Sequence, residues 1–222
     1  MRGNGRARPA VFVFDPPMAQ TAHYRFPLIA REGWPYIVAV AAAAAAVHYF
    51  AGGPWAVPLW LAAAGMLYLF RDPARAVPAS PLGVVSPVDG RVESLATVED
   101  PWLERQALQV RFRMNPLGVF SVRSPVEGKV ARQWLPKARG RHPYAQWFQT
   151  DEGDDIVLAV VPQARQRRTI CYVAAGQRIG QGQRCGYIPF GMEVDLLLPT
   201  DSRAKVQPGQ RVASGVDIVA HL

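Results

Sequence analysis

A long run without charged side chains is the feature that most constrains this sequence. Between Gly33 and Phe70, 38 residues include no Asp, Glu, Lys or Arg. The turn signal Gly52-Gly53-Pro54 divides the run into two apolar stretches of 17 residues, Pro35–Ala51 and Pro54–Phe70. A helix needs about 17 to 20 apolar residues to cross the hydrocarbon core of a bilayer. The run therefore predicts a helical hairpin embedded in a membrane.

Positive side chains flank this hairpin on both sides. Arg25 and Arg31 precede it, Arg71 and Arg75 follow it, and the short connection between its halves carries no charge. Because Lys and Arg concentrate on the cytoplasmic side of a membrane, the pattern predicts two passes through the inner membrane, with the rest of the chain facing the cytoplasm. A shallow hairpin within one leaflet stays open, since both halves are short and Pro58 interrupts the second. A cleaved signal peptide fits poorly, because the run is too long and begins too late.

The composition changes after the hairpin. Short runs rich in β-branched residues follow, separated by Gly and Pro, at 83–85, 107–112, 156–161, 169–173, 194–198 and 216–220. Short strands with frequent turn signals predict a β-rich domain. We therefore expect three parts: a basic N-terminal segment over residues 1–32, the membrane hairpin over 33–70, and a β domain over 71–222. Met1 and Met18 are both open as the start of the chain.

Two pairs of repeated segments refine the prediction for the β domain. Ser86–Val92 recurs as Ser124–Val130, and Gly176–Ile179 recurs as Gly209–Val212. The longer unit, Ser-Pro-Val-acid-Gly-base-Val, places a tight turn before a strand. Such paired turn-strand units resemble the barrel-sandwich architecture of lipoyl- and biotinyl-type domains, so we expect a barrel-sandwich-like domain.

The overall charge favours an anionic partner. The chain has 25 Lys and Arg against 17 Asp and Glu, a net charge of +8, which suits a membrane surface, a nucleic acid or an acidic substrate. No basic stripe with interleaved aromatic residues is present, so nucleic acid is not expected. The four histidines and two cysteines show no metal-ligand spacing, and no metal site is expected.

Ordered motifs point to a family. They are Arg31–Pro35, Phe70–Arg75, Val85–Gly90, Met114–Pro125, Arg167–Val173, Gly186–Gly191 and Val194–Pro199. From about residue 25 to the end, this series resembles the short, membrane-anchored bacterial phosphatidylserine decarboxylases. The resemblance implies a proenzyme in which an Asp–His–Ser set cleaves the chain before the serine and converts it into a pyruvoyl group. That group acts as the electron sink while phosphatidylserine loses CO2 and becomes phosphatidylethanolamine.

The residues of the set are only partly retained in this sequence. Asp89 stands at the position of the family's aspartate, but Phe120 replaces the histidine and Met192 replaces the serine after Gly191. Cleavage needs a hydroxyl or thiol nucleophile, and a phenylalanine does not move protons. The resemblance therefore implies a divergent member that forms no pyruvoyl cofactor. Without its partners, Asp89 is interpreted as a turn residue of Pro-x-Asp-Gly.

Other side chains are weaker candidates for the missing chemistry. Ser121, Ser202 and Ser214 carry hydroxyls, and His142 lies in a polar loop. Turn positions favour serine for structural reasons alone. We do not expect any of them to restore processing.

Three functions stay open at this point. The first is a pseudoenzyme that binds phospholipid headgroups or regulates a partner, such as an active paralogue or a second copy of itself. The second is an active phosphatidylserine decarboxylase with a non-standard processing residue, and the third is a membrane-anchored assembly factor. The candidate headgroup ligands are Arg132, Lys137, Arg139 and Arg141, for which a solvated basic loop is the alternative interpretation.

Overall fold

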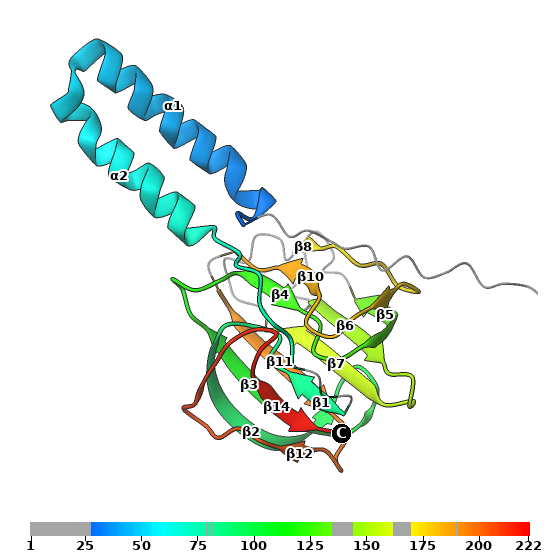
Figure 1. The fold of residues 1–222 in the computed structure, drawn as a ribbon. Helices are drawn as coiled ribbons and strands as arrows, with labels where there is room; N and C mark the ends of the chain where they lie inside the picture. The colour runs from blue at the N-terminus through cyan, green and yellow to red at the C-terminus, as the bar shows by residue number, and fades with distance from the viewer. Residues whose placement is uncertain (1–27, 79, 81, 135–143, 162–169, 190) are drawn as a thin grey trace, which may run out of the picture.

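The computed structural model describes residues 28–78, 80, 82–134, 144–161, 170–189 and 191–222. A short 3-10 turn, Arg31–Gly33, leads into two helices, α1 (Trp34–Ala51) and α2 (Gly53–Leu69). They run side by side as a hairpin that projects from the β domain (Figure 1). Proline lies in the first turn of each helix, where its missing N–H costs no hydrogen bond. Gly52 has a φ of 93° at the turn, a backbone conformation that glycine tolerates.

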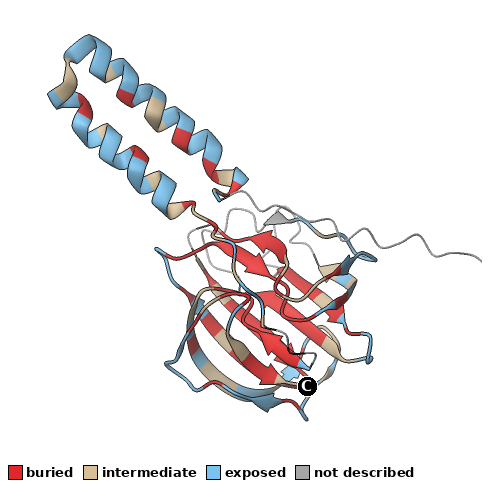
Figure 2. Cartoon of the chain, in the orientation of Figure 1, coloured by how far each residue is buried: buried red, intermediate tan, exposed pale blue. Residues whose placement is uncertain are grey.

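The hairpin exposes apolar side chains along most of its length. Figure 2 shows both helices largely exposed, and the exposed residues include Tyr49, Phe50, Trp55 and Leu61. Arg31–Ala51 is long and apolar enough to cross a membrane, whereas Gly53–Leu69 is an apolar helix of 17 residues. The predicted pair of apolar helices is therefore present, with Pro58 accommodated inside α2.

The β-rich domain predicted after the hairpin is confirmed. Its strands are β1 (Gly83–Val85), β2 (Gly90–Asp100), β3 (Arg105–Met114), β4 (Ser121–Arg123), β5 (Gly128–Trp134), β6 (Tyr144–Gln149), β7 (Asp155–Val160), β8 (Ile170–Cys171), β9 (Arg178–Ile179), β10 (Arg184–Tyr187), β11 (Glu193–Leu198), β12 (Arg203–Ala204), β13 (Arg211–Val212) and β14 (Ile218–His221).

Antiparallel pairing joins these strands into three sheets. The largest has the order β13-β2-β3-β11-β7-β6-β5-β9, and the two smaller sheets are β1-β14-β12 and β4-β10-β8. The described strands do not close into a barrel. Apolar side chains of the sheets meet in one main core that includes Phe112, Phe148 and Leu196.

The repeated segments have matching local structures. Ser86 Oγ donates to the carbonyl of Val88 at 2.8 Å, and Ser124 Oγ donates to that of Val126 at 2.7 Å. Gly90 and Gly128 then begin β2 and β5, where a Cβ would overlap the backbone of the neighbouring strand. The shorter repeats supply β9, which pairs with β5, and β13, which pairs with β2. The strand that follows each long repeat thus pairs with a strand from one of the short repeats.

Buried charges join the hairpin to the β domain. Asp72, which follows α2, is 1% exposed and accepts a hydrogen bond from Ser121 Oγ at 2.9 Å. Its carboxylate lies 3.4 Å from Arg123 Nη2 and 3.4 Å from Arg184 Nη1. Arg184 also pairs with Glu32, at the start of the hairpin, at 3.1 Å. Burial lowers the pKa of the Arg123 guanidinium, an effect that Asp72 opposes.

The junction predicts an asymmetry between two aspartates. Asp72→Asn leaves Arg123 and Arg184 buried without their shared counter-ion, and we expect the free energy of unfolding to fall by about 3–5 kcal/mol. Asp151→Asn removes an exposed ion pair with Arg178 and should change the melting temperature little. Thermal unfolding of the full chain in a neutral detergent measures both. Equal melting temperatures for the two variants would contradict the structural role of the buried network.

Candidate functional site

The carboxylate of Asp89 is held in an ion pair with Arg75. Arg75 Nη1 contacts Asp89 Oδ1, and Arg75 Nη2 donates to Oδ2 at 2.7 Å. The backbone N–H of Ser214 also donates to Oδ1 at 2.7 Å, and the Ser214 carbonyl accepts from Arg75 at 3.0 Å. The hydrogen bond to Asp89 raises the pKa of Arg75. Asp89 therefore already has donors on both carboxylate oxygens.

Phe120 is packed in the apolar core. It lies just before β4, is 2% exposed, and its ring meets the ring of Tyr187 edge-on with centroids 6.1 Å apart. Its carbonyl accepts a hydrogen bond from the N–H of Ile188 at 2.9 Å. Burial raises the pKa of the neighbouring Tyr187 hydroxyl. The side chain at this position thus contributes volume and contacts rather than a proton-transfer group.

Gly191 and Met192 lie immediately before β11. Gly191 has a φ of 69°, and a Cβ there would approach the Cβ of Met114 at 3.2 Å. Met192 is 7% exposed and belongs to the same buried core as Met114 and Phe120. Its sulfur is a thioether without an exchangeable proton.

Backbone hydrogen bonds bring the chain near Asp89 and Met192 to one end of the large sheet. The N–H of Asn115 donates to the carbonyl of Asp89 at 3.1 Å, and the N–H of Met114 donates to that of Met192 at 3.1 Å. The end of β3 therefore lies between the starts of β2 and β11. Phe120 and Met192 belong to the same buried core, whereas the Asp89 carboxylate faces Arg75.

The hydroxyls of the alternative serines differ in their hydrogen bonding. Ser121 donates its hydroxyl to Asp72, and Ser214 donates its hydroxyl to the carbonyl of Pro87 at 3.1 Å. Ser202 is buried, and its hydroxyl has no hydrogen-bond partner among the described residues. His142 lies outside the described residues.

The proposed headgroup cluster is only partly described. Arg132 is exposed on β5, with its guanidinium 5.2 Å from the centre of the Trp134 ring. Lys137, Arg139 and Arg141 lie outside the described residues.

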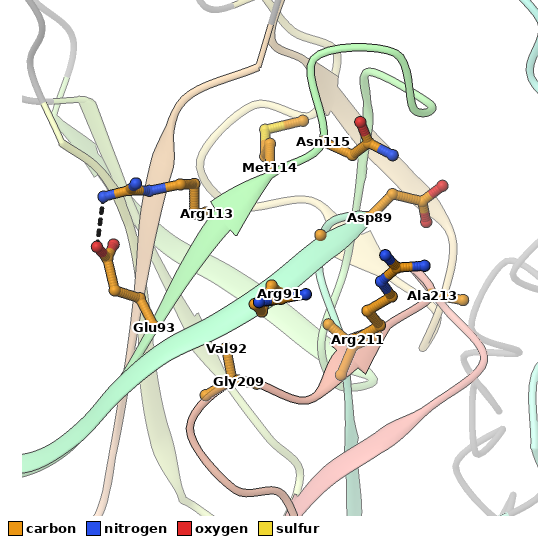
Figure 3. Close-up of a pocket in the computed structure, with 12 residues that line it drawn as sticks. Asp89, Arg91, Val92, Glu93, Arg113, Met114, Asn115, Gly209, Arg211 and Ala213 are labelled. Carbon is orange, nitrogen blue, oxygen red and sulfur yellow. Dashed lines mark hydrogen bonds and ion pairs between the residues drawn. The ribbon is translucent and has the colours of Figure 1, made fainter.

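A pocket of about 710 Å³ opens beside Asp89. It is lined by the chain around three strands, β2, β3 and β13, and Figure 3 shows its charged residues. These are Asp89, Arg91, Glu93, Arg113 and Arg211, joined by the polar side chain of Asn115. No group of three or more His, Cys, Asp or Glu side chains suited to a metal ion occurs within the described parts of the chain.

The sequence motifs indicated Asp89 but not Arg75, which binds it. They gave no indication that Asp72, Arg123 and Arg184 form a buried network. Asp72 and Arg75 both lie in the Phe70–Arg75 motif, which in the sequence marks the end of the hairpin. The available signal was the group of charged residues Arg71, Asp72 and Arg75 shortly after an apolar helix.

The packing of Phe120 generates a stability prediction. Phe120→Ala should lower the free energy of unfolding by about 3–5 kcal/mol, because it leaves a cavity in a packed core. Leu117→Ala is the matched control three residues away, since Leu117 is 66% exposed, and should change stability by about 0.5 kcal/mol or less. Thermal unfolding of both variants measures the difference. A harmless Phe120→Ala would show that this position is not packed as described.

Comparison with known proteins identifies the family. The family model described as phosphatidylserine decarboxylase matches residues 63–220. The phosphatidylserine decarboxylase proenzymes of Nitrosomonas eutropha and Aromatoleum aromaticum are each 39% identical over 211 residues, which cover 90% of this chain and 98% of the relatives. That of Burkholderia cenocepacia is 38% identical, with 90% of this chain and 99% of the relative covered. These matches show that the chain belongs to the phosphatidylserine decarboxylase family.

Proposed function

We propose that this protein serves phospholipid metabolism at the membrane without forming a pyruvoyl group, by binding phospholipid headgroups or regulating a partner. The observation that carries the proposal is Met192 at the position of the processing serine. An acyl shift onto the side chain needs a hydroxyl or thiol at residue 192, and elimination to a dehydro residue needs the same β-heteroatom. The sulfur of methionine is at the δ position and serves neither step. The residues present therefore do not fit the cofactor that the family implies.

The surroundings of the other two positions support the proposal. Phe120, buried against Tyr187, offers no general base. Both carboxylate oxygens of Asp89 are already bonded to Arg75, and the N–H of Ser214 donates to one of them. All three positions that correspond to the family's reactive set are thus occupied by packing or by ion pairing.

The proposal predicts a chain that stays intact. The purified full-length protein should appear as one species of 24.4 kDa by mass spectrometry, with no fragment ending at Gly191. It should release no CO2 from phosphatidylserine, because no electron sink is formed. Two fragments together with decarboxylase activity would overturn the proposal and favour an active enzyme with a non-standard processing residue.

The matched variants separate the contributions of residues 120 and 192. Met192→Ser alone should stay unprocessed, because it lacks the base at position 120. Phe120→His combined with Met192→Ser restores both groups. Partial cleavage after Gly191 in this double variant would show that the fold still places Asp89 where processing needs it. Efficient cleavage of the single variant would show that position 120 is not needed as a base.

We also propose that the hairpin spans the inner membrane, with the β domain in the cytoplasm. The support is the exposed apolar surface of both helices and the arginines that flank them.

The matched repeats support a barrel-sandwich-like relation between the two halves of the domain. As a partner, we propose an active paralogue or a second copy of the chain.

Fractionation tests the membrane placement. The full chain should sediment with membranes and need detergent for extraction, whereas residues 71–222 should stay in the supernatant. A cysteine introduced as Gly53→Cys, at the hairpin tip, should react with an impermeant thiol reagent in spheroplasts if the hairpin crosses the bilayer. The unmodified chain, which has Cys171 and Cys185, serves as the control for reaction of the native thiols. Full-length protein that remains in the supernatant without detergent would contradict the proposal.

A further inference from the structure

Three arginines form a row across adjacent strands of the large sheet. Arg211 on β13 is the register partner of Arg91 on β2, and Arg91 is the register partner of Arg113 on β3. Directly opposed residues of antiparallel strands project from the same face, and like charges there destabilise the sheet. All three arginines are exposed and line the pocket beside Asp89 (Figure 3). The arginine row therefore carries a repulsion that the fold does not require.

The acidic residues of the pocket do not neutralise the whole row. Glu93 pairs with Arg113, which also lies 3.4 Å from Glu193. Asp89 pairs with Arg75, outside the row. Among the described residues, Arg91 and Arg211 form no ion pair. Two guanidinium groups thus remain without a counter-ion at the pocket.

A further donor faces the same space. Asn115 Oδ1 accepts a hydrogen bond from the N–H of Leu117 at 3.0 Å, which leaves the amide NH2 as a donor at the pocket wall. The pocket volume of about 710 Å³ lies within the range of small-ligand sites. The pocket wall therefore combines two cations without an ion pair, Arg91 and Arg211, with the neutral donor Asn115.

The internal repeat provides a comparison. At the equivalent edge, Arg178 on β9 is the register partner of Lys129 on β5, and Lys129 is the register partner of Gln149 on β6. Here Gln149 takes the place of Arg113, and Arg178 is paired with Asp151. The second copy therefore has two cations instead of three and a counter-ion of its own. Among the described residues, the copy that forms the pocket leaves two cations without an ion pair, whereas the second copy leaves one, Lys129.

We infer that the arginine row binds a phosphate-bearing anion. Guanidinium groups form bidentate, charge-assisted hydrogen bonds with phosphate oxygens, and such a ligand would remove the repulsion along the row. The phosphate of a lipid headgroup and that of a soluble phosphoester share this chemistry. The lipid source rests on the headgroup binding proposed above, whereas the phosphate site itself does not.

Titration calorimetry of the full chain in a neutral detergent tests the inference. The two probes are inorganic phosphate and dihexanoyl phosphatidylserine, each at constant ionic strength. We expect the unmodified chain to bind at least one probe, and Arg91→Gln combined with Arg211→Gln to weaken that binding by about tenfold or more. Lys129→Gln combined with Arg178→Gln is the matched control, with the same loss of charge at the equivalent edge, and should bind normally.

The pattern of losses identifies the source of the phosphate. Loss of phosphatidylserine binding supports a lipid headgroup, and loss of inorganic phosphate binding alone supports a soluble phosphoester. No binding of either probe by the unmodified chain, or equal weakening by both double variants, overturns the inference. Two chain fragments in the same preparation would contradict the proposed function and leave the phosphate result intact.

A second measurement guards against misfolding. Without ligand, Arg91→Gln should raise the melting temperature by about 1–3 °C, because it removes the charge in the middle of the row. A lower melting temperature would show that Arg91 is already neutralised within the protein, and would also overturn the inference.

Discussion

The carboxylate of Asp72 is the contact on which the arrangement of the whole molecule depends. Two arginines of the β domain are buried beneath the hairpin, and Asp72 supplies their shared counter-charge from the segment that leaves α2. Breaking such a buried network is costly, although forming it adds little stability beyond what an apolar contact would give. We infer that the buried network fixes one position of the hairpin relative to the β domain. The height of the β domain above a bilayer would then follow from the protein's own contacts.

The region around Asp89, Phe120 and Met192, which the motifs predict to be the family's reaction centre, has two faces of opposite character. On the core side, Phe120 and Met192 complete a packed apolar interior. On the outer side, Asp89 is bound to Arg75 and borders a pocket rich in guanidinium groups. The polar face does not depend on the side chain at residue 192. The proposed binding of an anion and the proposed absence of pyruvoyl chemistry are therefore compatible in one domain.

Local patterns in the sequence predicted the elements better than their contacts. The uncharged run predicted both helices, and the Gly- and Pro-bounded runs predicted the β-rich domain, because these signals depend on neighbouring residues. The Arg75–Asp89 pair and the buried network around Asp72 join residues 14 to 152 positions apart. Such pairings depend on how strands meet in space, which periodicity does not encode. The arginine row likewise becomes visible only when the register of three strands is known.

The matched repeats have a consequence for how the chain finds its fold. The N–H of Val130 donates to the carbonyl of Gln177 at 2.9 Å, and the N–H of Val92 donates to that of Gln210 at 2.9 Å, so the two edges offer almost the same partner groups. A growing chain completes β2, β5 and β9 before β13. When β9 leaves the ribosome, it therefore meets two similar open edges. Connectivity and the order of synthesis, rather than local affinity, must therefore decide whether β9 pairs with β5, as in the native fold, or with β2.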